Sequence, residues 1–288
     1  MVFFVAIIEV SITKKRWLMM ITTIALDLDN TLLNSAKEIS AENERVLKQL
    51  HKMGKRIVLC TGRPIQGIQR LLTQLELFEP TDYAITFNGG LIRHNQTQRI
   101  LAQTTIGKQE VAALYQDAEQ RHYPIDVIGA DKVYSIVTLG KSDYESSMGA
   151  VLPFADISFD ELPADRAFGK AVCAAPAEVV QRVRKEMPTE LTDLLHIVPS
   201  RAELLEFLPN NVNKAHGLSQ LMAHFGETLD NVMTFGDEEN DFEMIAQAGV
   251  GVAMGNAIPQ IKQVANAETL TNNEDGVAAY LKQYFDLR

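Results

Sequence analysis

Several features that would point to particular functions are scarce in this chain of 288 residues. It contains only two cysteines, Cys60 and Cys173, which lie far apart, each inside an apolar run typical of a strand. That excludes a disulfide-rich scaffold and predicts buried free thiols in a reducing compartment, which favours a cytoplasmic protein; a disulfide between the two is the less favoured alternative. His94, His122 and His196 are isolated and lack the spacing of metal ligands, so we expect them to be solvated or to cap helices.

Positive charge is also scarce. The chain has 37 acidic against 27 basic side chains, a formal net charge of −10, and no basic run of useful length. This balance argues against a non-specific nucleic-acid surface. It does not exclude small anionic substrates, because the local charge at a site decides what binds there.

The first nineteen residues lack the features of a targeting signal or a membrane anchor. Val2–Ile8 is apolar, but Glu9 interrupts it and basic residues follow, whereas a secretory signal has its basic residues first. The run is also shorter than the ~20 apolar residues of a membrane span. Because Met19 and Met20 stand directly before the first expected strand, we expect residues 1–19 to be a leader outside the fold; a loosely attached tail is the alternative.

Strands and helices alternate from Thr22 onward, which is typical of βαβ units and a parallel sheet. The strands of this pattern are expected at residues 22–26, 56–60, 83–87, 204–208, 232–235 and 250–254. Its helices are expected at residues 40–52, from 64 to about 77, and at 214–226, 241–247 and 276–285.

The middle of the chain interrupts this alternation with elements of its own. Strands are expected there at residues 133–137, 170–174 and 194–198, and helices at 108–121 and 177–187. The stretch is large enough to be a domain. We therefore expect residues 20–102 and 204–288 to form a discontinuous core, into which residues 103–203 are inserted as a lid.

Two acidic strings follow expected core strands. Asp27 and Asp29 come directly after the first strand, and Asp237 and Asp241 after the strand at residues 232–235. Ligands of open parallel sheets bind just beyond the carboxyl ends of the strands. Four carboxylates gathered there would repel one another unless a divalent cation lay among them. The sequence therefore predicts a site for a hard metal ion at this edge of the sheet.

The residues around this edge are those that move a phosphoryl group. Asp27 and Asp29 point to the same side of an extended segment, so that one can attack as a nucleophile while the other handles a proton. Thr61 offers a hydroxyl and a backbone N–H at a helix start, Lys214 a compact positive charge, and Asn240 a neutral donor. An anionic nucleophile approaching a phosphate dianion needs such cations, with Mg²⁺, to offset repulsion.

Four segments, in order, resemble the motifs of haloacid-dehalogenase (HAD) superfamily phosphatases of the Cof type, close to the YidA-like sugar phosphatases. They are Asp27-Leu28-Asp29-Asn30-Thr31, Thr61-Gly62-Arg63-Pro64, Asn213-Lys214 and Gly236-Asp237-Glu238-Glu239-Asn240-Asp241. The resemblance extends from Ile21 to the end and is weak in the middle stretch. Asn30 and Ala215 depart from the usual glycines; Asn tolerates unusual backbone angles and a helix start accepts Ala.

The resemblance implies an α/β fold: a doubly wound, Rossmann-like parallel-sheet core with an inserted α/β cap of the C2 type. It implies that Asp27 attacks phosphorus, and that Asp29 protonates the leaving group and then activates water. It implies that Mg²⁺ is held by Asp27, the Asp29 backbone carbonyl and Asp237, with waters ordered by Glu238 or Asp241. The phosphate would be bound by Leu28, Thr61, Gly62, Lys214 and Asn240.

The implied substrate is a small phosphorylated metabolite, above all a sugar phosphate. Candidates for recognising the rest of it are Arg63, Asn88, Arg93 and Lys170, although an exposed salt bridge explains each equally well. A phosphosugar mutase and a non-enzymatic phosphometabolite sensor remain alternatives. A phosphorylated receiver domain is disfavoured. Such switches need a long-lived acyl phosphate, whereas Asp29 could speed its hydrolysis.

Overall fold

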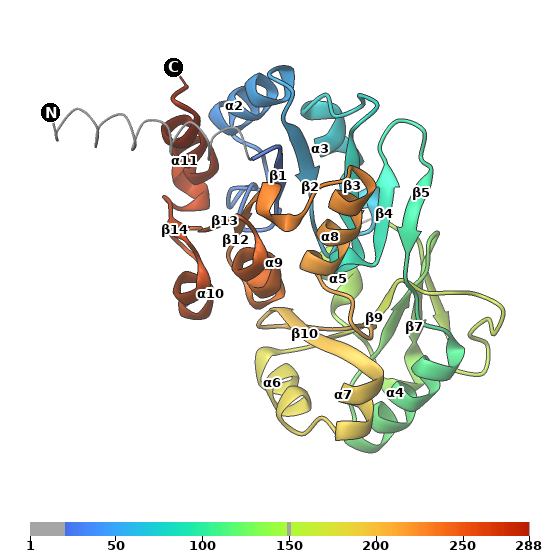
Figure 1. Ribbon diagram of the computed structural model, residues 1–288. Coiled ribbons are helices and arrows are strands. Elements are labelled where there is room, and N and C mark those ends of the chain that lie inside the picture. Colours follow the sequence, from blue (N-terminus) through green and yellow to red (C-terminus); the bar gives the residue numbers. More distant parts are fainter. Residues whose placement is uncertain (1–20, 149–150, 288) are drawn as a thin grey trace, which may run out of the picture.

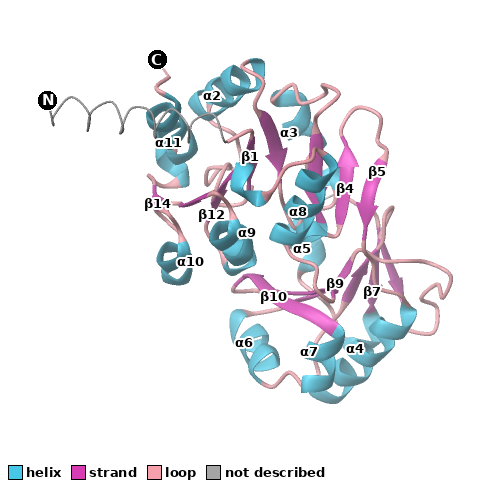
Figure 2. Cartoon of the chain, in the orientation of Figure 1, coloured by secondary structure: helices cyan, strands magenta, loops and turns pink. Residues whose placement is uncertain are grey.

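The computed structural model describes residues 21–148 and 151–287 (Figure 1). The expected leader, residues 1–19, therefore lies outside the described residues. The described chain forms two parts, a core that contains the first and the last described element and a cap below it in the view of Figure 1. Each part has its own sheet and its own helices, as the colours of Figure 2 make plain.

The core is built on a parallel sheet of five strands in the order β14-β13-β12-β1-β2. The strands are β1 (Thr23–Leu26), β2 (Arg56–Leu59), β12 (Val232–Gly236), β13 (Val250–Ala253) and β14 (Ala267–Glu268). A parallel bridge between Cys60 and Ile85 places β3 (Tyr83–Thr86) beside β2. From β3 an antiparallel meander continues through β4 (Leu91–His94) and β5 (Ile100–Gln103). This topology confirms the expected doubly wound parallel core.

Helices cover the core sheet, and side-chain caps fix where two of them begin. The helices are α2 (Ala41–Lys52), α3 (Gln69–Gln74), α8 (Lys214–His224), α9 (Phe242–Gln247), α10 (Pro259–Val264) and α11 (Gly276–Phe285). Ser40 accepts a hydrogen bond from the backbone N–H of Asn43 at the start of α2, as the sequence predicts. Asn213 accepts one from His216 and thereby fixes the first turn of α8, which carries Lys214.

The cap contains a mixed sheet of six strands in the order β10-β11-β9-β6-β7-β8. Its strands are β6 (Asp126–Ile128), β7 (Val133–Ile136), β8 (Phe154–Ile157), β9 (Lys170–Ala174), β10 (Leu195–Arg201) and β11 (Leu204–Pro209). Its helices are α4 (Lys108–Arg121), α5 (Tyr144–Met148), α6 (Ala177–Lys185) and α7 (Thr189–Leu194). An inserted α/β cap with its own sheet confirms the expected fold class.

Side chains of the cap sheet alternate between two apolar clusters. Ala171 and Cys173 pack with Val111 of α4 and Val180 of α6, on the face that the helices cover. The neighbouring residues of β9, Val172 and Ala174, pack instead on the other face, with Phe87 and Leu91 of the core. The period of two along the strand thus gives one face to the helices of the cap and the other to its joint with the core.

One expected core strand belongs to the cap. The run at residues 204–208 was expected in the core, but β11 pairs antiparallel with β9 and β10, so the chain returns to the core only after Pro209. Both faces of β11 are buried, because Leu204 joins the cluster at the joint and Leu205 the cluster under the helices. A continuous apolar run indicates a buried strand without indicating which sheet receives it.

Cys60 and Cys173 are buried free thiols, as expected. Within residues 21–148 and 151–287, no helix combines the length and apolarity that crossing a membrane requires.

Candidate active site

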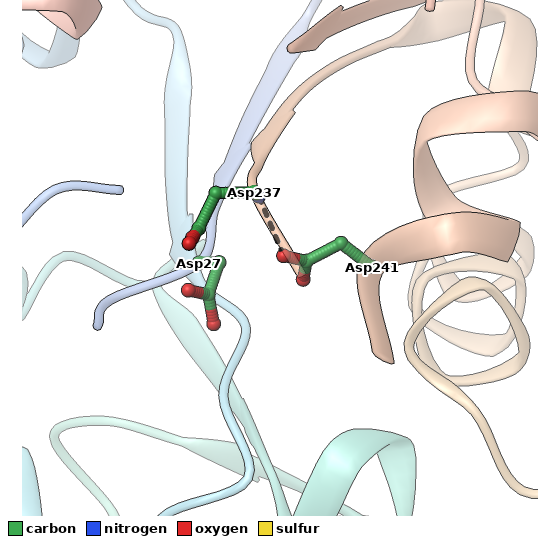
Figure 3. Close-up of side chains that lie close together, drawn as sticks. All are labelled: Asp27, Asp237 and Asp241. Atoms are coloured by element: carbon green, nitrogen blue, oxygen red, sulfur yellow. Dashed lines mark hydrogen bonds between the residues drawn. The ribbon is translucent and has the colours of Figure 1, made fainter. Parts of the chain in front are cut away.

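Three buried carboxylates meet where β1 and β12 end. Asp27 follows β1, Asp237 follows β12, and Asp241 lies one turn further on, directly before α9 (Figure 3). One carboxylate oxygen from each lies within 4.8 Å of the others. The second oxygen of Asp241 accepts hydrogen bonds from the backbone N–H groups of Asp237, at 2.9 Å, and of Glu238, at 3.2 Å. Asp241 therefore fixes the loop that carries Asp237.

Lys214 links this cluster to the start of α8. Its Nζ lies 2.5 Å from Oδ1 of Asp27 and 2.6 Å from Oδ1 of Asp241, and its side chain is fully buried. Burial by itself lowers the pKa of this ammonium, but the charges of Asp241 and Asp27 outweigh it and raise the pKa above the usual value. Lys214 is therefore a fixed positive charge against the Asp27 carboxylate.

One ammonium does not balance three carboxylates. Burial raises the pKa of Asp27 to about 7, with Lys214 opposing the shift and Asp241 adding to it. Burial, with repulsion from Asp27 and Asp241, raises the pKa of Asp237 to about 9. Carboxylate oxygens are the ligands of hard divalent cations, and such a cation would supply the missing positive charge. The cluster therefore fits a metal ion.

Asp29 lies in a different electrostatic environment, although it is two residues from Asp27. Its carboxylate accepts hydrogen bonds from Arg63, at 2.9 and 2.7 Å, and from Lys37 Nζ, at 2.8 Å. Burial raises the pKa of Asp29, but these two cations outweigh it and lower the pKa to about 2. Asp29 is therefore ionised here. Sequence reasoning missed Lys37, because nothing in the first motif marks a lysine eight residues beyond Asp29.

Two backbone donors that directly follow Asp27 and Thr61 in the described chain are unpaired. Among the described residues, the N–H groups of Leu28 and Gly62 donate no hydrogen bond. The Thr61 hydroxyl accepts from the N–H of Arg63 at 3.2 Å, which keeps its own proton available. Asn240 donates from Nδ2 to Oδ1 of Asn88 at 3.1 Å. Free donors beside Asp27 are what a bound anion requires.

A cavity of about 520 Å³ opens in front of these groups, between the core and the cap. The core side of its lining includes Asp27, Asp29, Lys37, Thr61, Gly62, Arg63, Glu238 and Asn240. The cap side includes Tyr144, Ser146, Val151, Lys170, Ser200, Arg201, Leu204 and Glu206. A ligand in this cavity would be enclosed from both parts of the molecule.

The four candidates for substrate recognition have different surroundings. Arg63 and Lys170 line the cavity. Asn88 is buried behind Gly62 and does not line it. Arg93 does not line it either, contrary to expectation, because it lies in β4 and its Nε donates to the backbone carbonyl of Gln98 within the same meander. Sequence reasoning missed Arg201 and Glu206, since it gave β10 no link to the site and placed β11 in the core.

The chain has clear relatives. Residues 24–281 match the model of the haloacid dehalogenase-like hydrolase family. The putative phosphatase YxeH of Bacillus subtilis is 35% identical over 88% of this chain and 95% of its own. The 5-amino-6-(5-phospho-D-ribitylamino)uracil phosphatase YitU of the same organism is 32% identical over 92% of this chain and 97% of its own. A crystal structure of a haloacid dehalogenase-like hydrolase from Bacteroides thetaiotaomicron superposes with a TM-score of 0.79, at 31% identity, and covers 92% of this chain and 100% of that one.

Proposed function

The chain belongs to the haloacid dehalogenase-like hydrolase family and is a phosphatase of small phosphorylated metabolites, and we propose that it hydrolyses sugar phosphates with the help of Mg²⁺. One observation carries the proposal: a buried nucleophile candidate, Asp27, lies between Lys214 and two further carboxylates, at the mouth of a cavity enclosed by a cap. The same residues are where the resemblance places nucleophile, lysine and metal ligands.

In the first half-reaction, an oxygen of Asp27 attacks phosphorus and the bond from phosphorus to the sugar oxygen breaks. Asp29 gives a proton to that leaving oxygen, so that an alcohol and an aspartyl-phosphate result. Lys214, the Thr61 hydroxyl, the Asn240 amide and the N–H groups of Leu28 and Gly62 hold the phosphoryl oxygens while negative charge redistributes among them.

In the second half-reaction, Asp29 removes a proton from water, whose oxygen attacks the aspartyl-phosphate. The acyl–phosphate bond breaks, and Asp27 and inorganic phosphate are released. The ionised Asp29 of this structure suits this second role. The first role requires a protonated carboxyl, so Arg63 and Lys37 must turn from Asp29 toward the anionic substrate when it binds. Both line the cavity and can do so.

The metal belongs in the carboxylate cluster. Asp27 and Asp237 would hold it together with the backbone carbonyl of Asp29, and Glu238 or Asp241 would order its waters. Mg²⁺ prefers such oxygen ligands and would offset the repulsion between the Asp27 carboxylate and the phosphate.

The cavity wall favours a compact polar substrate. Ser146, Ser200 and Arg201 offer hydrogen-bonding groups to the hydroxyls of a sugar. A second candidate is the phosphorylated ribitylaminouracil that YitU is named for, since the relationship is nearly as close as that to YxeH. Tyr144, Val151 and Leu204 form an apolar part of the wall against which a pyrimidine ring would pack.

The test is phosphate release from a panel of sugar phosphates and the ribitylaminouracil phosphate, with Mg²⁺ or with EDTA, for the wild type and for Asp27→Asn. We expect release that needs Mg²⁺, disappears in the variant and is fastest with a sugar phosphate. Fastest release from the ribitylaminouracil phosphate would replace the proposed substrate class. An isomerised sugar phosphate as the product would indicate a mutase. If folded, metal-replete protein binds a substrate of the panel without releasing phosphate, the chain would be a sensor.

A further inference from the structure

A buried ion pair lies at the joint between cap and core, in the lining of the cavity, and has no part in the reaction steps described above. Lys170 begins β9 and Glu206 lies in the middle of β11, and Nζ of the first is 2.7 Å from Oε2 of the second. Both side chains are only 2% exposed. Removing one partner of such a pair leaves an uncompensated buried charge, so the two residues depend on each other.

Both residues of the pair also reach into core loops. Lys170 Nζ donates to the backbone carbonyl of Gly62 at 2.8 Å, in the loop after β2. Oε2 of Glu206 accepts from Nδ2 of Asn88 at 2.9 Å, in the turn after β3. Oε1 of Glu206 accepts from the Ser200 hydroxyl at 2.6 Å, within the cap. One carboxylate of the cap is therefore tied to a core turn directly, and to a second core loop through Lys170.

Glu206 fixes which way the neighbouring amides face. An ionised carboxylate only accepts hydrogen bonds, so Asn88 must present its NH₂ to Glu206. Its carbonyl oxygen then faces Asn240, whose NH₂ lies 3.1 Å away. Asn240 donates one amide N–H to Asn88, which leaves the second N–H for another acceptor. Asn240 also lines the cavity. A donor is thus presented where the phosphate is proposed to bind.

The turn that holds Asn88 also touches the other phosphate loops. Asn88 has a left-handed backbone (φ 52°), and its amide packs against Gly62, where an added Cβ would come within 3.1 Å of it. The next residue, Gly89, lies so close to Asn213 that a Cβ there would come within 2.1 Å of the Asn213 carbonyl oxygen. Asn213 caps the helix that carries Lys214. A shift of this turn would therefore disturb several phosphate-binding groups at once.

We propose that Glu206 is a positioning residue that makes the phosphate site depend on the cap: through Asn88 it sets the orientation of the Asn240 amide, and through Lys170 it holds the Gly62 loop. The proposal rests on the proposed function, because it takes Asn240 and Gly62 as phosphate-binding groups. Glu206 itself acts through these neighbours and is not assigned a step in the reaction.

The direct test measures binding of inorganic phosphate to the Mg²⁺-loaded protein by calorimetry, alongside KM and kcat. We expect Glu206→Ala to weaken phosphate binding roughly 10–100-fold, because the amides lose the acceptor that fixes their orientation. Glu206→Gln keeps an acceptor oxygen and should lose less. Asn88→Gly retains the left-handed backbone and removes only the link to Asn240, so it should lose part of the affinity that Glu206→Ala loses. The double variant should bind phosphate no more weakly than Glu206→Ala, because that change already removes both links.

Asp126→Asn is the matched control. Asp126 of β6 and Glu206 of β11 both pair with Val172 of β9, so they lie on the same face of the cap sheet, and both are buried. Asp126 bonds Ser135 within the cap and does not line the cavity, so phosphate binding should be unchanged. KM should rise in the Glu206 variants and stay constant in the control.

Three results would overturn the inference. The first is a folded Glu206→Ala variant that binds phosphate as tightly as the wild type. The second is a double variant in which the losses of phosphate affinity of the two single variants multiply. The third is an Asp126→Asn variant that loses as much phosphate affinity as Glu206→Ala. If Glu206→Ala does not fold, Glu206→Gln and Asn88→Gly decide the question by the same comparison. A wild-type protein that neither binds phosphate nor releases it from any substrate would instead contradict the proposed function.

Discussion

Two clusters of buried charge in this molecule differ in their balance. In the cap joint, Lys170 faces one carboxylate, Glu206, and both hydrogen-bond to further polar groups. In the core, Lys214 pairs with two carboxylates, Asp27 and Asp241, of a cluster of three that also contains Asp237. A balanced pair with satisfied hydrogen bonds requires nothing more, whereas an excess of buried negative charge is costly until a cation joins it. The balanced pair in the cap joint therefore stabilises the fold, whereas the unbalanced cluster in the core is suited to binding a cation.

The pKa values follow this difference. Burial, aided by its acidic neighbours, raises the pKa of Asp237 to about 9, so that the metal-free site keeps part of its charge neutralised by protons. A site of this kind exchanges those protons for a divalent cation when one is present. The predictions below change charges in these two clusters or beside them, and ask whether turnover, binding or stability changes.

The largest effect is expected from Asp27→Asn. This change removes the nucleophile and keeps the shape of the side chain, so turnover should fall about 10⁴-fold or more. Phosphate release under saturating substrate and Mg²⁺ measures it. Thermal unfolding serves as the control, since the variant must remain folded. Turnover within tenfold of the wild type would mean that another group attacks phosphorus.

Asp29→Asn should reduce turnover by roughly 10²–10⁴-fold, because an amide cannot exchange a proton with the leaving group or with water. The loss should fall mainly on kcat, since Arg63 and Lys37 remain available to the substrate. Substrates with better leaving groups need less help from an acid, so aryl phosphates should lose less than sugar phosphates. A uniform loss across both classes would argue against an acid role for Asp29.

Breaking the balanced pair of Lys170 and Glu206 should affect the stability of the fold more than the reaction. Lys170→Met leaves the Glu206 charge buried and unpaired, which should lower the free energy of unfolding by about 3–5 kcal/mol. The double variant Lys170→Met/Glu206→Leu removes both charges and should recover most of that loss. Urea unfolding measures both. A double variant as unstable as the single one would show that the pair contributes more than mutual neutralisation.

The sequence predicts the core well because its signals there are local. Strand-like runs followed by Asp27 or Asp237, and the capping residue Ser40, need only neighbouring residues to be recognised. The core helix expected at residues 276–285 has those same bounds in the structure, as does the cap helix expected at residues 108–121. The cluster of Asp27, Asp237 and Asp241 follows from the rule that parallel strands end at one edge.

Pairing between distant strands is what the sequence does not reveal. β11 is buried on both faces, and only its register with Cys173 and Val172 of β9 shows that it belongs to the cap. Glu206 then faces the core through a buried pair whose partner lies 36 residues earlier in the chain. Sequence reasoning likewise gave no strand at β4, β6 or β8.

Mg²⁺ should stabilise the protein through the unbalanced cluster. At about 100 times its dissociation constant, a ligand that binds only the folded state adds about 2.7 kcal/mol. We expect a rise in the unfolding temperature with Mg²⁺ that EDTA reverses. Asp237→Asn should abolish most of the rise, and Asp126→Asn, which changes a buried cap carboxylate, should retain it. A rise of equal size in Asp237→Asn would place the metal elsewhere.

The metal-free protein should lose stability as pH rises. The pKa of Asp237 is raised in the folded state from 3.8 to about 9, and that of Asp27 to about 7, so the folded state binds more protons than the unfolded state between these values. The slope of stability with pH is therefore negative over this window. Unfolding in EDTA at pH 5, 7 and 9 should show the decline, and Asp237→Asn should flatten it. An unchanged slope in Asp237→Asn would contradict the assigned shift.

The smallest effect is expected from an ion pair that also joins cap and core but lies in solvent. Arg184 of α6 pairs with Glu239, and their side chains are 49% and 38% exposed. Water screens such a pair, so Arg184→Gln should change the free energy of unfolding by less than about 1 kcal/mol, and the change should shrink further at high salt. Urea unfolding at low and high salt measures it, with Lys170→Met as the reference. If the two variants lower the free energy of unfolding equally, burial would not be what distinguishes the two ion pairs. If Arg184→Gln hardly changes the free energy of unfolding and Lys170→Met lowers it, the buried pair is what couples cap to core. Its carboxylate has no water to replace the lost partner.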